Sequence, residues 1–77
     1  EQDLARQFEI SRRLENTLNA IQHLPLEMRN TLYASLETDG SYQDTADALA
    51  IPIGTVRSRL SRAREQLKRA TNSHPFQ

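Results

Sequence analysis

The sequence predicts an all-α fold: a small four-helix domain that ends in a helix-turn-helix. The composition is rich in Leu, Ala, Arg, Glu and Gln and contains only two glycines, which favours helices. Apolar residues recur at three- and four-residue spacings along most of the chain, as on one face of a helix. Turn-forming residues interrupt this periodicity near positions 24, 40 and 51, so the chain divides into four helices.

Length and composition limit what the chain can be. At 77 residues it has room for one small domain, and the absence of cysteine excludes disulfides and thiolate metal sites. No apolar run approaches the roughly 18 residues that span a bilayer, and no signal-peptide pattern opens the chain. We therefore expect a soluble, cytoplasmic protein that needs no cofactor and no metal.

The first helix is expected over about residues 3–22, where Leu14, Leu18 and Ile21 share one face. Residues 1–13 have a weaker apolar register, which predicts a linker or a helical extension. The expected domain covers residues 14–70, and residues 71–77 are expected to form a disordered tail.

The second helix is expected from about Pro25 to Thr38, since proline suits the first position of a helix. Met28, Leu32 and Leu36 follow one another at four-residue steps, which predicts a common apolar face. Gly40 is expected to end this region with a positive φ.

The third helix is expected to begin after Ser41, which with Asp44 three residues later resembles a capping box. Its narrow inward face is predicted to consist of Tyr42, Thr45, Ala46 and Leu49.

The turn Ala50-Ile51-Pro52 follows, because proline cannot continue the third helix. We expect Ile51 to fill the gap between the helices and the fourth helix to run from about Ile53 to Ala70. The inward stripe of that helix is predicted to be Val56, Leu60, Ala63 and Leu67.

The formal net charge is zero, but the charges are unevenly distributed. Residues 1–50 contain four arginines and nine acidic residues, giving −5, whereas residues 51–77 contain six basic residues and one acidic residue, giving +5. This asymmetry indicates one basic surface suited to a polyanion. A solvated, charged helix face is the alternative reading.

The outward face of the fourth helix has side chains suited to reading DNA. Arginine can place a planar fork against guanine, and serine is short enough for the helix backbone to approach base edges. The candidate base-reading residues are Arg57, Ser58, Ser61 and Arg62. The candidate phosphate-binding residues, expected to fix register without reading sequence, are Thr55, Arg59, Arg64 and Lys68.

Three motifs carry a family resemblance: Leu24-Pro25, Gly40-Ser41-Tyr42 and Gly54-Thr55-Val56-Arg57-Ser58-Arg59-Leu60-Ser61-Arg62-Ala63-Arg64. In this order and spacing they resemble region 4 of bacterial sigma factors, and more narrowly the extracytoplasmic-function group. The resemblance covers about residues 14–70.

The resemblance implies a function and partners. Region 4 places its last helix in the major groove of the promoter minus-35 element and docks on the β flap of the RNA polymerase core, thereby directing the polymerase to stress-type promoters. In many family members an anti-sigma factor covers these surfaces. A complete sigma factor also has a region 2, which this sequence lacks, so we expect an excised domain or a stand-alone regulator that binds duplex weakly and starts no transcription by itself.

The sequence departs from the family at four positions. Ala50 stands where glycine is usual, so the turn must avoid positive φ there or accept modest strain. Thr45 replaces a common isoleucine and Asp44 a common glutamate. Ser61 occupies a variable position, so the promoter sequence cannot be inferred.

Two other readings remain open at this point. One is a stand-alone helix-turn-helix regulator of the response-regulator effector type, although Arg-Ser-Arg-Leu-Ser-Arg-Ala-Arg favours sigma. The other is a protein-docking module for an anti-sigma factor, built on the amphipathic helices of residues 3–38. An enzyme is not expected, because His23 and His74 are isolated and no carboxylate pair stands beside a nucleophile.

Overall fold

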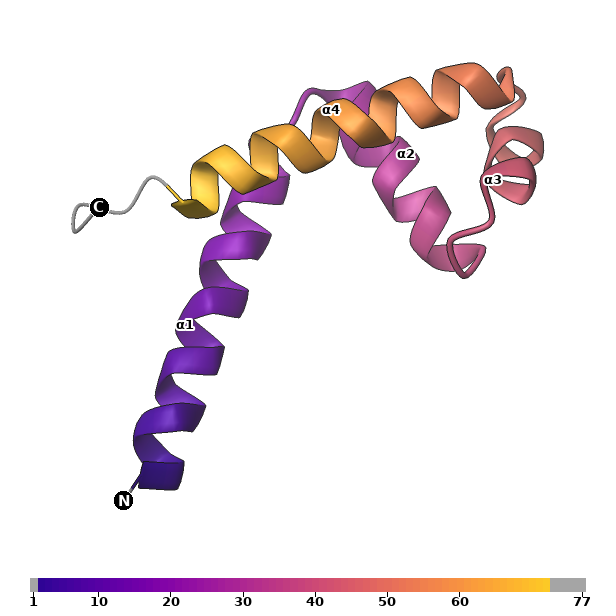
Figure 1. Ribbon diagram of the computed structural model, residues 1–77. Helices are drawn as coiled ribbons and strands as arrows, with labels where there is room; N and C mark the ends of the chain where they lie inside the picture. The colour runs from indigo at the N-terminus through magenta and orange to yellow at the C-terminus, as the bar shows by residue number, and fades with distance from the viewer. Residues whose placement is uncertain (1, 73–77) are drawn as a thin grey trace.

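The computed structural model describes residues 2–72, and they form four helices. These are α1 (Gln2–Gln22), α2 (Leu26–Glu37), α3 (Tyr42–Leu49) and α4 (Ile53–Asn72), with no strand in the described range. The predicted all-α, four-helix fold is confirmed. Figure 1 shows α4 crossing α2 and the C-terminal end of α1, while the N-terminal part of α1 extends away from the other helices.

α1 is one uninterrupted helix, so the described part of residues 1–13 continues the helix of residues 14–22. Its apolar side chains are largely exposed along the extension, including Phe8 at 79% and Leu14 at 58%. Burial begins near the end of the helix, where Ile21 is half-buried and Leu24, just beyond it, is 5% exposed. Packing against the rest of the molecule therefore starts at the C-terminal turns of α1.

α2 begins one residue later than expected, because Pro25 is its N-cap and not its first helical residue. The predicted apolar face is wrong at Leu36, which is 65% exposed. Four-residue steps advance about 40° around a helix, so two steps from Met28 rotate Leu36 out of the interface. The buried residues of α2 are instead Thr31, Ala34 and Ser35, whose small side chains let α3 and α4 approach closely.

The end of α2 requires two residues with positive φ. Gly40 has φ 82°, as predicted, but Asp39 also has φ 53°, which the sequence did not indicate. The Gly40 N–H donates to the Ser35 carbonyl at 2.7 Å and the Asp39 N–H to the Leu36 carbonyl at 3.3 Å. These bonds satisfy carbonyls that the helix end leaves free.

α3 is capped by Ser41, as the sequence predicted, but the Ser41 N–H donates to the Thr38 carbonyl at 3.1 Å and does not complete the expected capping box. The Ser41 side chain accepts the Asp44 N–H at 3.1 Å, which satisfies one of the first free donors of the helix. Thr45 is fully buried, and its hydroxyl lies 2.6 Å from the Ser41 carbonyl and 2.8 Å from the Thr38 hydroxyl. The threonine that replaces a common isoleucine thus keeps its polar atom hydrogen-bonded in the α2–α3 interface.

In the turn between α3 and α4, Ala50 does not avoid positive φ and so accepts the modest strain that the sequence left as one of two possibilities. Ala50 is left-handed, with φ 56° and ψ 45°. Ile51 donates its N–H to the Ala46 carbonyl at 3.1 Å and packs against the core, confirming its predicted place between the helices.

The core lies beneath α4 and agrees with the predicted inward stripe. Val56 and Ala63 are 0% exposed, Leu60 is 5% exposed and Leu67 is half-buried. α4 continues to Asn72, and the rest of the predicted tail lies outside the described residues. None of the described helices is both long and apolar enough to cross a membrane.

Candidate nucleic-acid interface

The candidate base-reading residues lie on the exposed side of α4. Because the Val56 and Leu60 side chains fix the opposite side of this helix in the core, the outward side is held in one orientation. All four predicted readers are exposed: Arg57, Ser58, Ser61 and Arg62. This exposure is what contact with base edges in a groove requires.

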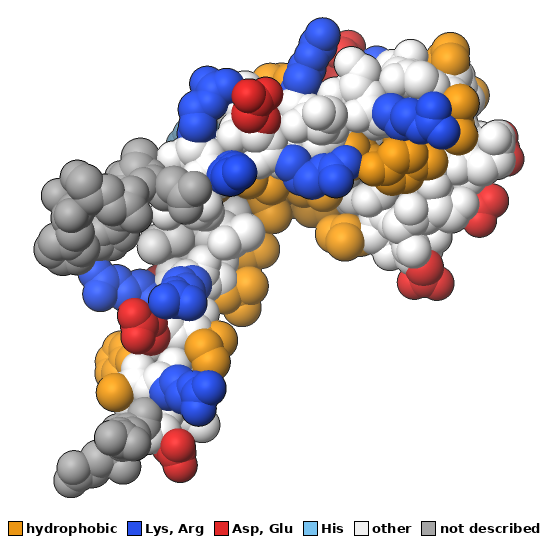
Figure 2. Space-filling view, in the orientation of Figure 1, with side chains coloured by type: hydrophobic (Ala, Val, Ile, Leu, Met, Phe, Trp, Pro, Cys, Tyr) orange, Lys and Arg blue, Asp and Glu red, His pale blue; other side chains and the backbone are white. Residues whose placement is uncertain are grey.

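Figure 2 shows how charge is distributed on the same face of the molecule. Lys and Arg side chains follow α4, and acidic side chains lie around α3, on α1 and among the cations of α4. The charge separation along the sequence is therefore only partial in space: α4 carries most of the cations, but Glu27 lies 3.5 Å from Arg59 and Glu65 lies 3.8 Å from Arg69.

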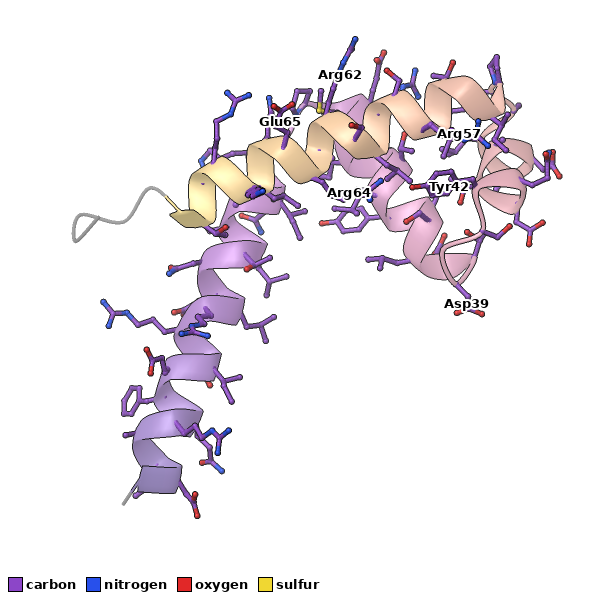
Figure 3. All side chains as sticks on the ribbon, in the orientation of Figure 1. Asp39, Tyr42, Arg57, Arg62, Arg64 and Glu65 are labelled. Carbon is purple, nitrogen blue, oxygen red and sulfur yellow. The ribbon has the colours of Figure 1, made fainter. Side chains whose placement is uncertain are left out.

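The arginines of α4 project from two different edges of the helix. In Figure 3, Arg62 points upward from α4, while Arg64 lies on the lower edge beside Tyr42. An anionic strand could therefore meet guanidinium groups on either side of the outward face.

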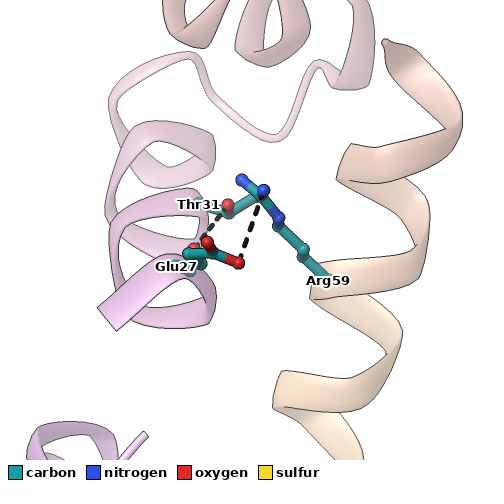
Figure 4. A network of polar contacts seen from close by, with 3 residues as sticks. All are labelled: Glu27, Thr31 and Arg59. Carbon is teal, nitrogen blue, oxygen red and sulfur yellow. Dashed lines mark hydrogen bonds and ion pairs between the residues drawn. The ribbon is translucent and has the colours of Figure 1, made fainter. Parts of the chain in front are cut away.

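Arg59 is tied to α2. Its Nη2 lies 3.5 Å from Oε2 of Glu27, and its side chain is only 26% exposed, compared with 77% for Glu27 (Figure 4). The Thr31 hydroxyl donates to the Glu27 backbone carbonyl at 2.7 Å and anchors the same turn. Any phosphate that approaches Arg59 must share this guanidinium with a carboxylate.

Arg64 is held by a neutral partner. Its Nη2 donates to the Tyr42 hydroxyl at 2.8 Å, across the α3–α4 interface, and its Nε donates a longer bond of 3.4 Å to the Leu60 carbonyl. Sequence reasoning assigned Tyr42 to the core alone and missed this contact. The two residues are 22 positions apart, so no helical spacing could have indicated it.

The remaining predicted phosphate contacts differ in exposure. Thr55 is half-buried in the first turn of α4, whereas Lys68 is exposed. Thr55 lies in a shallow groove between α2 and α4, lined by Pro25, Glu27, Met28, Gly54, Thr55, Ser58, Arg59 and Arg62. Glu65, the one acidic residue among residues 51–77, pairs with Arg69 one turn further along α4, at 3.8 Å.

No metal-binding cluster accompanies this surface in the described range. Residues 2–72 contain no group of three His, Cys, Asp or Glu side chains that could hold a metal. Nδ1 of His23 lies 2.8 Å from the Asn19 carbonyl at the exposed end of α1. His74 lies outside the described residues.

Comparison with known proteins identifies the family. The family model described as sigma-70, region 4, matches residues 14–67. The chain belongs to this family. The expected resemblance to region 4 of sigma factors of the extracytoplasmic-function group is confirmed, and so is the expectation that the domain is not enzymatic.

Two curated relatives align with this region 4 domain. It is 54% identical over 66 residues to the RNA polymerase sigma factor HrpL of Pseudomonas syringae pv. syringae, an alignment that covers 86% of this chain and 36% of that protein. It is 44% identical over 50 residues to the RNA polymerase sigma-H factor of Pseudomonas aeruginosa, covering 65% of this chain and 26% of that protein. The chain thus spans about a third or less of either relative. No solved structure gave a significant match.

Proposed function

We propose that this region 4 domain binds the minus-35 element of bacterial promoters, in the cytoplasm, as part of a sigma factor that directs RNA polymerase to stress-type promoters. The observation that carries the proposal is the outward face of α4, where exposed arginines and serines are held on a helix that is fixed in the core by its opposite side. Family membership favours this function over the response-regulator alternative.

In this proposal the outward residues divide into two groups. Arg57, Ser58, Ser61 and Arg62 contact base edges in the major groove, and Thr55, Arg59, Arg64 and Lys68 contact backbone phosphates. Arg59 does so in competition with Glu27, which it contacts in the free protein. The groove that contains Thr55 gives a path for the sugar-phosphate backbone beside the readers.

We further propose that the RNA polymerase core, through its β flap, and an anti-sigma factor are the protein partners. The support is the exposed apolar surface of α1 and α2, which includes Leu18 at 52% and Leu36 at 65% exposure. On α1 such side chains lie together, since Phe8, Leu14 and Leu18 line one shallow groove, and a group of exposed apolar side chains is typical of a surface that contacts another protein. The docking alternative is thus a second role of the same domain, on helices other than α4.

Base reading and phosphate binding can be separated by two substitutions. Arg62→Ala should reduce affinity for a preferred duplex by about 1–3 kcal/mol and relax base preference, because a bidentate contact to guanine is lost. Lys68→Ala should weaken binding to all duplexes about equally. Duplexes selected from a random pool by the unaltered chain, and scrambled duplexes of the same composition, can be compared by fluorescence anisotropy.

The two variants serve as each other's control, since both remove one exposed cation from α4. Equal loss of affinity on selected and scrambled duplexes for both variants would show that Arg62 does not read bases. Failure of the unaltered chain to prefer any duplex would contradict the proposed function itself.

A further inference from the structure

We propose that Tyr42 and Arg64 form one phosphate-binding unit, in which the tyrosine hydroxyl positions the guanidinium and adds a second donor to the same phosphate. Tyr42 is the new member: it is the first residue of α3, not of α4, and it packs against the core cluster of Ala46, Val56 and Leu60. The inference rests on the proposed DNA-binding function and deepens it by naming a residue outside α4 that takes part in backbone contact.

The contact leaves both groups able to bind an anion. The Tyr42 hydroxyl accepts from Nη2 of Arg64 at 2.8 Å, so its own proton is available, and no residue of the range 2–72 accepts that proton. A guanidinium carries five N–H donors, and the bonds to Tyr42 and Leu60 occupy only part of them. Because the phenol is neutral, Arg64 also keeps its full charge.

Arg59 provides the contrast within the same helix. Its partner, Glu27, is an anion that offsets the charge of the guanidinium, whereas the partner of Arg64 orients the guanidinium without offsetting it. Holding a long side chain in place before binding reduces the conformational entropy lost when a phosphate is bound. Of these two partnered arginines, Arg64 is therefore the one prepared for a phosphate.

The position of the pair fits a backbone contact. Arg64 is exposed and follows Arg57 by seven residues, which places the two on nearly the same side of α4, about 10 Å apart along its axis. In Figure 3 the Tyr42 and Arg64 side chains meet at the edge of α4 opposite Arg62. A DNA strand that passes along this edge would contact Arg57 through a base edge and the Tyr42–Arg64 pair through a backbone phosphate.

The test compares Tyr42→Phe with Tyr33→Phe, the matched loss of a hydroxyl from the half-exposed tyrosine of α2. Tyr42→Phe keeps the ring in the core and should weaken binding of selected and scrambled duplexes alike by about three- to tenfold, typical of one lost hydrogen bond. The slope of log K against log salt should not change, since no charge is removed. Arg64→Ala should lower the magnitude of that slope by about 0.9. Tyr33→Phe should match the unaltered chain.

The double variant separates joint action from two independent effects. If the pair acts on one phosphate, Tyr42→Phe in an Arg64→Ala background should cost at most half of its single-variant effect on log K. Thermal unfolding of each variant, followed by circular dichroism, tests whether the fold is kept. The inference is overturned by an equal loss in both backgrounds, by no loss on Tyr42→Phe, or by a loss that only accompanies unfolding. An unaltered chain that does not bind duplex overturns the proposed function instead, and this inference with it.

Discussion

At the residue scale, the contacts that matter most for the basic surface join residues far apart in the sequence. Helical phase correctly predicted which side of α4 would be exposed, because the apolar stripe of Val56 and Leu60 determines it. It could not predict that Arg59 contacts Glu27 or that Arg64 contacts Tyr42, since those pairs exist only once α2 and α3 pack on α4. The residues of the candidate site were thus predictable, but their partners were not.

The Glu27 carboxylate should limit the affinity of the domain for DNA. Glu27→Gln removes the anion that occupies Arg59, so binding to any duplex should tighten by about two- to fivefold, the range expected for a weak ion pair. Anisotropy titrations on selected and scrambled duplexes measure this. Glu37→Gln, an exposed carboxylate at the other end of α2, is the control and should have little effect. Weaker binding of Glu27→Gln would mean that Glu27 orients Arg59 for phosphate and does not compete with it.

At the scale of the helices, local sequence signals predicted where α3 and α4 begin, but they did not predict the buried face of α2. α3 and α4 begin where Ser41 and Pro52 predict, because capping depends on neighbouring residues alone. The buried face of α2 depends instead on how closely other helices approach, and there Thr31 and Ser35 are buried while Leu36 is exposed.

The left-handed residue at the end of α3 allows a test of stability. Ala50 has φ 56°, where its Cβ is strained, so Ala50→Gly should raise the free energy of unfolding by about 1 kcal/mol. For a domain of this size that corresponds to a rise of about 4–8 °C in Tm. Ala48→Gly, at an exposed position in the last turn of the same helix and without positive φ, should instead lower the free energy of unfolding, by at most about 0.5–1 kcal/mol. Thermal melts followed by circular dichroism measure both changes in Tm. If Ala50→Gly and Ala48→Gly shifted Tm in the same direction, strain at Ala50 would be contradicted.

At the scale of the whole molecule, zero net charge hides two opposed regions. The acidic first fifty residues and the basic remainder sum to zero, yet α4 carries six cations and a single carboxylate, Glu65. Within about 10 Å, the screening length at moderate salt, a phosphate near α4 meets mainly positive charge. Overall charge is therefore a poor guide to the ligand of this domain, and local charge is the relevant quantity.

Binding to duplex should accordingly depend steeply on salt despite the neutral composition. If three to five of the α4 cations contact phosphates, the slope of log K against log salt should be about −2.7 to −4.5, because each neutralised phosphate releases about 0.9 of a counterion. Arg13→Gln is the control: Arg13 lies on α1, is 79% exposed and pairs with Glu9 at 3.7 Å, so its loss should leave the slope unchanged. Anisotropy titrations from about 50 to 200 mM salt cover the useful range. A flat response would exclude the groove-binding surface on α4. If Arg13→Gln and Arg64→Ala changed the slope equally, the DNA would contact cations on α1 as much as on α4, and α4 would not be the specific phosphate-binding surface.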